Sequence, residues 1–105
     1  MSDFQKQVLD MVKEIPAGRV LTYSRIAEKI GRPAAARAVG NALNKNQADF
    51  LSQSFVKIPC HRVVRADGSI GGFRHSQKHK IALLELEGVK VVNNRIDLRQ
   101  YGGEI

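Results

Sequence analysis

The chain contains one cysteine, Cys60, and a histidine and an arginine, His61 and Arg62, follow it directly. The thiolate is the nucleophilic form of cysteine, and a free thiol titrates near about 8.5. An imidazole and a guanidinium beside the thiol are therefore expected to raise its thiolate fraction at neutral pH. A lone cysteine is also among the most frequently buried residue types. On this adjacency alone, an inert core cysteine is the favoured interpretation, and the rest of the chain must decide.

The length and the composition restrict where such chemistry could occur. The 105 residues predict one domain, residues 1–105, with a single modest core. One cysteine cannot form an internal disulfide, and His61, His75 and His79 lack the spacing of a zinc site, so we expect no metal. No apolar run approaches the roughly 20 residues of a membrane span, and the N-terminus lacks a signal-peptide pattern. We expect a soluble, cytoplasmic protein, monomeric and without a membrane partner.

The net charge indicates a class of partner. Seventeen Lys and Arg against ten Asp and Glu give a formal charge of +7 and an isoelectric point near 10.0. This balance is typical of proteins that bind polyanions, which makes nucleic acid the first partner to consider. The alternative is a small basic protein whose charge serves solubility alone.

The N-terminal half shows a pattern of three helices. A capping box at Ser2 and apolar residues at helical spacing predict a first helix up to Ile15. Thr22 is a suitable N-cap for a second helix, which Gly31 ends. A third helix is expected from Ala34 to about Asn44, rich in small side chains. Two short helices joined by a tight glycine-containing turn form a helix-turn-helix pattern.

The C-terminal half mixes short β segments with one helix. Residues 45–57 have no periodicity and are expected to form a loop, and 61–65 form a short β-branched stretch. Ser76 is a suitable cap for a helix that ends at Gly88, and residues 89–98 resemble a small hairpin with an Asn-Asn turn. The predicted fold class is α+β and mostly helical: a winged-helix-like, helix-turn-helix DNA-binding domain with short β hairpins.

Several separate segments together resemble the catalytic, DNA-binding domain of the 6-O-alkylguanine-DNA alkyltransferases. A Pro-Cys-His-Arg run alone would be a weak signal, but the segments occur in one order at family-like spacing over nearly the whole chain. They are residues 15–20 with Thr22 and Tyr23, residues 35–40, Asn46, residues 58–64, residues 71–74 and residues 83–88.

The resemblance implies a single-turnover DNA repair reaction. Cys60 would take the alkyl group, such as methyl, from 6-O-alkylguanine in duplex DNA and remain alkylated, so that each protein molecule acts once. No cofactor is implied. The guanine is the leaving group of this displacement, and a proton donor is expected near it.

The resemblance also implies the catalytic roles. Cys60 would be the nucleophile, and His61 would activate it through a bound water. Glu87 would orient His61 and stabilise the imidazolium. The hydroxyl of Tyr23 would face the extruded base, and Asn46 would connect the helix-turn-helix to the active-site segment.

For DNA binding, Arg37 resembles the arginine that fills the gap left by a flipped nucleotide. Small residues around it would let the helix enter the minor groove, where the bases are read with little sequence preference. The expected DNA-binding residues are Arg37, Ala36, Ala38, Gly40, Thr22, Tyr23 and Arg62. The expected substrate pocket consists of Pro59, Val63, Gly72, Phe73 and Arg74, with the last three in a loop over the alkyl group.

The sequence departs from the family pattern in places, and its length and final residues leave a second function open. We expect the catalytic domain alone, without the N-terminal domain of many members. The stretch from Asn46 to Pro59 is long, and Phe73 stands where tyrosine is common. The short length and the final residues 95–101 resemble the alkyltransferase-like proteins, which bind damaged DNA without repairing it and carry tryptophan at the cysteine position. This chain has no tryptophan and has Cys60 there. The alternatives are a lesion sensor that recruits other repair factors and, from the charge alone, an ordinary helix-turn-helix regulator.

Overall fold

The first helix follows from its apolar spacing. The computed structural model describes residues 3–44, 58–71 and 77–102. Helix α1, Asp3–Lys13, buries Val8, Leu9 and Val12 on one face. It ends two residues before Ile15, where short i to i−3 hydrogen bonds from Glu14 and Ile15 close the last turn. The predicted helix is confirmed, and the predicted capping residue Ser2 lies outside the described residues.

The helix-turn-helix is present as predicted. Helix α2, Tyr23–Lys29, is capped by Thr22, whose Oγ1 accepts a hydrogen bond from the Arg25 backbone N–H at 3.0 Å. Helix α3, Ala36–Asn44, begins two residues later than expected, because the chain first makes a turn in which Ala35 N donates to Arg32 O. Its residues Val39, Ala42 and Leu43 are buried against α1 and α2.

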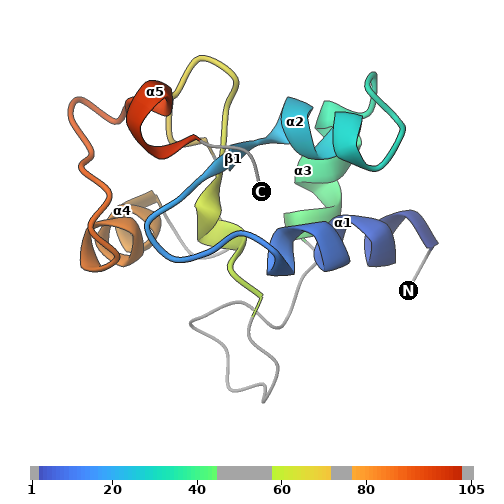
Figure 1. Ribbon diagram of the computed structural model, residues 1–105, viewed down its shortest axis with the longest axis horizontal. Helices are drawn as coiled ribbons and strands as arrows, with labels where there is room; N and C mark the ends of the chain where they lie inside the picture. The colour runs from blue at the N-terminus through green and yellow to red at the C-terminus, as the bar shows by residue number, and fades with distance from the viewer. Residues whose placement is uncertain (1–2, 45–57, 72–76, 103–105) are drawn as a thin grey trace.

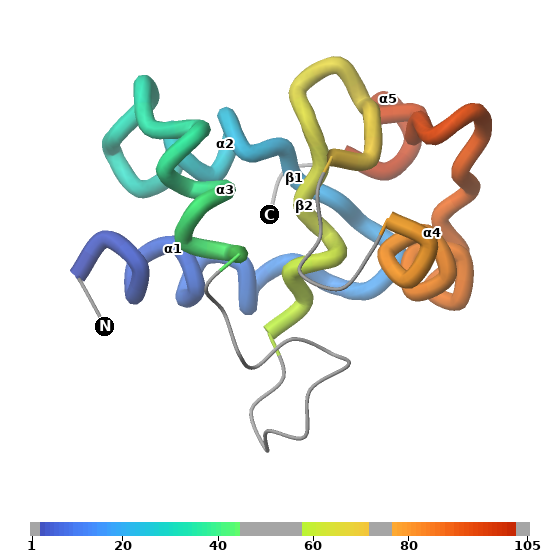
Figure 2. Tube along the Cα trace, turned by 180° about the vertical axis from the view of Figure 1, so that it is seen from behind, coloured from blue at the N-terminus to red at the C-terminus, as the bar shows by residue number. Residues whose placement is uncertain are grey.

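A short parallel sheet joins the two halves of the molecule. Strand β1, Leu21–Thr22, pairs with strand β2, Val63–Val64, in the register Leu21 to Val63 and Thr22 to Val64. A 3-10 turn, η1, Cys60–Arg62, leads into β2, so only the second part of the predicted 61–65 strand is extended. In Figures 1 and 2 this segment runs between α1 to α3 on one side and α4 and α5 on the other.

The core consists of two clusters that meet along this sheet. Cys60 and Val63 pack with the buried faces of the first three helices, whereas Val64 packs with Val20 and Leu84. Neighbouring residues of an extended chain point to opposite faces, so β2 contributes one valine to each cluster. The segment after Cys60 is therefore fixed from both sides.

The C-terminal half differs from prediction in one respect. Helix α4, Gln77–Leu86, is as expected. The predicted 89–98 hairpin is reduced to a tight turn, in which Asn93 and Asn94 have positive φ angles of 52° and 60° and one bridge pairs Val92 with Arg95. The residues of the predicted second strand pair elsewhere: Arg95 forms an antiparallel bridge with Ser69, and Ile96 N donates to Gly68 O at 2.8 Å. Helix α5, Leu98–Tyr101, then follows, capped by the Asp97 side chain, which accepts from Arg99 N at 2.9 Å.

The α+β, mostly helical class with a helix-turn-helix is confirmed by this arrangement. In the ranges that the structure describes, every helix is too short or too polar to cross a membrane.

Candidate active site and nucleic-acid interface

The turn η1 holds the cysteine. Cys60 N donates to Ile58 O at 2.8 Å, and Arg62 N donates to Pro59 O at 3.0 Å, which fixes the backbone on both sides of the thiol. The Cys60 side chain is free of any disulfide and only 7% exposed. Its burial in the first core cluster agrees with the inert interpretation, so the polar groups around it carry the case for reactivity.

The residue after the cysteine is paired with a carboxylate from the other half of the molecule. His61 is completely buried, and its Nε2 lies 3.0 Å from Oε2 of Glu87. Glu87 directly follows α4 and precedes Gly88, which turns the chain with a φ of 86°. The end of α4 thus brings together the two side chains that the sequence analysis paired.

Arg62 requires a correction. It was expected to bind DNA, but it is 8% exposed and faces inward. Its Nε donates to Glu87 Oε1 at 2.9 Å, its Nη2 pairs with Glu87 Oε2, and its Nη1 donates to Ile15 O at 2.8 Å. A guanidinium held by a bidentate carboxylate and a backbone carbonyl is not placed to contact phosphate.

The protonation states of the pair follow from this environment. Burial lowers the pKa of His61, although the Glu87 carboxylate opposes the shift. Burial by itself would raise the pKa of Glu87, but hydrogen bonds from Arg62 and His61 outweigh it and the pKa is lowered. The site at neutral pH therefore contains a carboxylate anion and a neutral imidazole, which can accept a proton.

Lys80 is a buried site residue that the sequence analysis missed. Its side chain is completely buried on α4, and its Nζ donates to Val63 O at 2.6 Å and lies 5.8 Å from the centre of the Tyr23 ring. Burial lowers its pKa from 10.5 to about 7, against the opposing influence of Cys60. A signal exists in the spacing: Lys80, Leu84 and Glu87 recur at i, i+4 and i+7, on one helix face.

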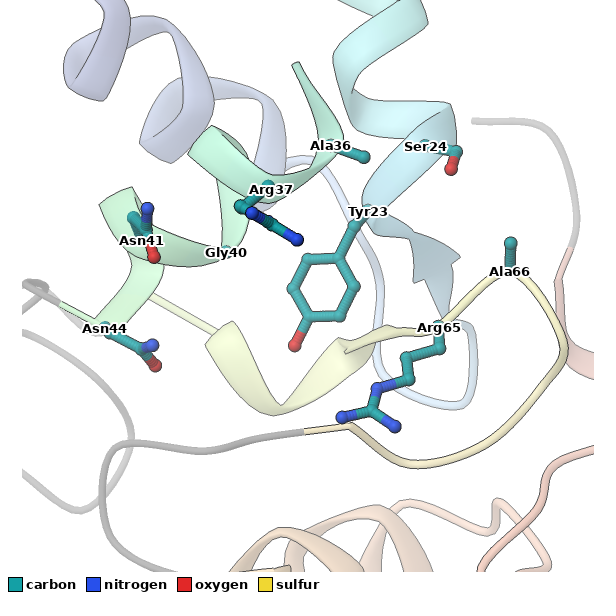
Figure 3. A pocket seen from close by; sticks show the side chains of 9 residues that line it. All are labelled: Tyr23, Ser24, Ala36, Arg37, Gly40, Asn41, Asn44, Arg65 and Ala66. Atoms are coloured by element: carbon teal, nitrogen blue, oxygen red, sulfur yellow. The ribbon is translucent and has the colours of Figure 1, made fainter. Parts of the chain in front are cut away.

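Tyr23 lies at a cleft between α3 and the segment after β2. Figure 3 shows its ring between Arg37 on one wall and Arg65 on the other. The cleft has a volume of about 560 Å³, within the usual range for small-molecule sites. Its described lining residues are Tyr23, Ser24, Ala36, Arg37, Gly40, Asn41, Asn44, Arg65 and Ala66.

The tyrosine at this cleft is a proton donor at neutral pH. Burial raises the pKa of Tyr23, an effect that the charge of Arg65 reduces and that of Cys60 increases. A protonated phenol can donate a hydrogen bond to a group that gains negative charge.

The other predicted site residues are placed as follows. Ala36, Arg37 and Gly40 line the cleft with Tyr23, while Ala38 is exposed on α3 without lining it. Thr22 uses its hydroxyl as a helix cap. Pro59 and Val63 are buried near the thiol segment. Asn46, Gly72, Phe73 and Arg74 lie outside the described residues. Within the described ranges, no group of three or more His, Cys, Asp or Glu side chains could hold a metal ion.

The fold and the site together define a helix-turn-helix domain whose cleft lies near a buried thiol and a His-Glu pair. The match of residues 3–89 to the DNA binding domain of 6-O-methylguanine DNA methyltransferase identifies the family more narrowly. The chain belongs to the 6-O-methylguanine DNA methyltransferase family.

Two curated relatives are named methylated-DNA–protein-cysteine methyltransferase. The one from Methanothermobacter thermautotrophicus is 41% identical over 90 residues, which cover 86% of this chain and 47% of the relative. The one from Saccharolobus islandicus is 47% identical over 88 residues, covering 84% and 52% respectively. The chain therefore spans about half the length of the curated relatives that it matches.

Two solved structures share the fold closely. Schizosaccharomyces pombe Atl1, in complex with damaged DNA containing O6-carboxymethylguanine, is 31% identical with a TM-score of 0.84, covering 100% of this chain and 98% of that one. Mycobacterium tuberculosis OGT in complex with DNA is 41% identical with a TM-score of 0.76, covering 84% and 50%.

Proposed function

We propose that this protein repairs duplex DNA by moving the alkyl group of 6-O-alkylguanine to Cys60. The arrangement that supports this most directly is the buried sequence Cys60-His61, with His61 Nε2 held by Glu87 beside the Tyr23 cleft. The two curated relatives carry the corresponding methyltransferase name. A cysteine with an adjacent base, itself oriented by a carboxylate, is the general arrangement of an activated nucleophile.

The chemistry is a displacement at the alkyl carbon. The Cys60 thiol gives its proton to His61, and because Glu87 occupies Nε2, the accepting nitrogen is Nδ1, directly or through a water. The thiolate forms a carbon–sulfur bond as the carbon–oxygen bond breaks, and the electron pair goes to the guanine. Tyr23 donates a hydrogen bond to the departing base. The guanine anion takes up one proton, and the imidazolium of His61 releases the proton that it accepted from the thiol, so the overall step transfers one proton from the thiol to guanine. Cys60 remains as a thioether, so the protein reacts once.

The base must leave the duplex to reach the thiol. Arg37 is exposed on α3 at the cleft, where its side chain can fill the gap that a flipped nucleotide leaves. The small residues Ala36, Ala38 and Gly40 let α3 approach the minor groove closely. Repair at any sequence requires such a contact, because the minor groove carries little sequence information.

A mass measurement tests the proposal. Incubation with an excess of duplex containing O6-methylguanine should add one methyl group to the protein, and Cys60→Ala should add none. An unchanged mass for the native chain would refute the transfer, and a mass gain that survives Cys60→Ala would refute the assignment of the nucleophile.

The second candidate is a sensor that binds alkylguanine without repairing it. It is favoured by the match to Atl1, which covers nearly the full length of both chains. Tight, lesion-specific binding by the native chain with no gain in mass would select this function. Preference for one operator sequence regardless of damage would instead indicate a regulator.

A further inference from the structure

Arg65 occupies a fixed position at the cleft that the mechanism above leaves unused. It directly follows β2, and its backbone is locked in a tight turn: its N–H donates to Ser69 O at 3.0 Å, and its carbonyl accepts from Gly68 N at 2.9 Å. The residue is exposed, and it lines the cleft across the Tyr23 ring from Arg37 (Figure 3).

Gly71 shows how closely Arg65 and Tyr23 are packed. A Cβ at Gly71 would lie 3.3 Å from each of three atoms: Arg65 Cγ, Tyr23 Cε2 and the Tyr23 hydroxyl oxygen. The stem of the arginine and the hydroxyl end of the tyrosine therefore meet at one point, where the chain has a φ of 76° and no side chain. This packing directs the start of the Arg65 side chain along the cleft rather than away from it.

The electrostatics of the cleft suit an anion. The described lining residues include Arg37 and Arg65 and no carboxylate. The positive charge of Arg65 acts on the groups around the cleft: it opposes the rise that burial causes in the pKa of Tyr23, and it adds to the fall that burial causes in the pKa of Lys80. The nearest acid along the chain, Asp67, accepts from Ser69 N at 2.9 Å and lies 3.9 Å from Arg95.

We propose that Arg65 binds a backbone phosphate of the nucleotide that enters the cleft. This inference rests on the proposed function, because it assumes that the occupant is a nucleotide. A guanidinium presents a planar fork of N–H donors that matches phosphate oxygens. Arg65 is exposed, whereas Tyr23 is half-buried and Cys60 is buried. A base that reaches the buried thiol past Tyr23 would therefore leave its phosphate beside Arg65. Arg65 is thus a positioning residue that holds the extruded nucleotide while the thiol reacts.

Three substrates separate this role from that of Arg37. Free O6-methylguanine has no phosphate and leaves no gap. A single-stranded oligonucleotide with the lesion has phosphates but leaves no gap in a duplex, and the duplex has both. Single-turnover rates are measured for the native chain, Arg65→Ala, Arg65→Lys, Arg37→Ala and a control, Arg99→Ala, which removes one exposed positive charge on α5 outside the cleft.

Relative to the control, Arg65→Ala should react about tenfold more slowly with the single strand and with the duplex, and at the native rate with the free base. Arg37→Ala should be slow only with the duplex. Arg65→Lys should recover part of the loss, because it restores the charge but not the fork. The salt slope of duplex binding should fall by about 0.9 for Arg65→Ala, as expected for one lost phosphate contact.

Three results would overturn the inference while leaving the proposed function intact. They are single-strand and duplex rates of Arg65→Ala equal to those of Arg99→Ala, an equal loss with the free base, and an unchanged salt slope. A native chain that transfers no methyl group to Cys60 from any substrate would instead refute the proposed function, and this inference with it.

Discussion

At the scale of single residues, Glu87 binds two partners with two oxygens. Its Oε2 contacts both His61 and Arg62, and its Oε1 accepts from Arg62 Nε. Arg62 is in turn anchored to the carbonyl of Ile15 at the end of the first helix. The buried guanidinium keeps the carboxylate ionised, and the carboxylate stabilises the imidazolium that forms when His61 takes a proton.

Glu87→Gln should distinguish the charge interactions of Glu87 with His61 and Arg62 from simple packing, because glutamine keeps the shape of the side chain and removes its charge. We expect alkyl transfer to slow roughly 100-fold or more, since the base loses the charge that favours its protonated form. The pKa of His61 should fall further, because the opposing effect of the carboxylate is gone. The unfolding free energy should fall by roughly 3 kcal/mol, since the buried Arg62 loses its partner.

The measurements are single-turnover transfer, NMR titration of His61 and urea unfolding. Glu85→Gln is the matched control, because Glu85 is exposed on α4 two residues earlier. A Glu87→Gln variant that matches Glu85→Gln in rate, or in which the pKa of His61 rises, would contradict the orienting role.

The sequence predicted the site residues that belong to a family motif. It did not predict those whose position depends on a partner far away in the chain. Cys60, His61 and Glu87 followed from the family motifs, and the structure places the last two in contact. The prediction that Arg62 binds DNA took no account of a buried partner. The burial of Arg62 depends on Glu87 and on the Ile15 carbonyl, which lie 25 and 47 positions away and come near only in the folded chain.

At the scale of elements, Lys80 ties α4 to β2 through the Val63 carbonyl. The pKa of Lys80 is about 7 in the folded protein and 10.5 in the unfolded chain. Between about pH 7 and pH 10.5 the unfolded chain therefore binds more protons than the folded protein. The unfolding free energy should therefore rise from about pH 7 toward pH 10, by up to about 1.4 kcal/mol per pH unit. Below about pH 7 this contribution is lost.

Urea unfolding of the native chain and of Lys80→Met across about pH 7.5 to 9.5 measures this slope. Methionine has a similar length and no charge, so the variant should show a flatter pH dependence whatever its absolute stability. Equal slopes for the two proteins would show that Lys80 keeps its proton in the fold.

Helix α3 contains a glycine, Gly40, that lowers the stability of the helix and keeps the wall of the cleft open. Gly40 is helical, and a Cβ there would lie 3.8 Å from Tyr23 Cε1, an ordinary contact. Gly40→Ala should raise the unfolding free energy by about 0.5 to 1 kcal/mol, because alanine loses less backbone entropy. The added methyl would narrow the cleft wall and keep α3 from close contact, so duplex repair should slow roughly tenfold. Thermal melts and single-turnover rates check both, and faster or unchanged repair would contradict the close approach.

Elements that depend on a local sequence pattern could be predicted, and elements that depend on pairing with a distant segment could not. The helices followed from apolar spacing and caps such as Thr22, with ends displaced by about a turn or less. The hairpin expected after Val89 is reduced to its turn, because Arg95 pairs with Ser69, 26 positions away. The Asp97 cap then starts a helical turn at Leu98. The parallel pairing of β1 with β2 joins residues 42 positions apart in two-residue strands, which have no periodicity to detect.

At the scale of the whole molecule, the reactive thiol is part of the packing that joins the two core clusters. Cys60 belongs to the cluster of the first three helices and directly precedes the segment that contributes Val64 to the other cluster. Its side chain is 7% exposed and is enclosed by its neighbours in the cluster. An alkyl group that remains attached to Cys60 therefore adds atoms at the edge of a packed core.

We accordingly expect the methylated protein to be less stable than the unreacted one. An added methylene in a well-packed core costs about 1 to 3 kcal/mol, and a domain of this size loses about 4 to 8 °C of Tm per kcal/mol. Melting curves before and after reaction with methylated duplex, with the DNA removed, should show this drop, and larger alkyl groups should give a larger one. Cys60→Ala treated in the same way controls for residual DNA. An equal or higher Tm for the methylated protein would mean that open space beside the thiol accommodates the alkyl group without strain on the core.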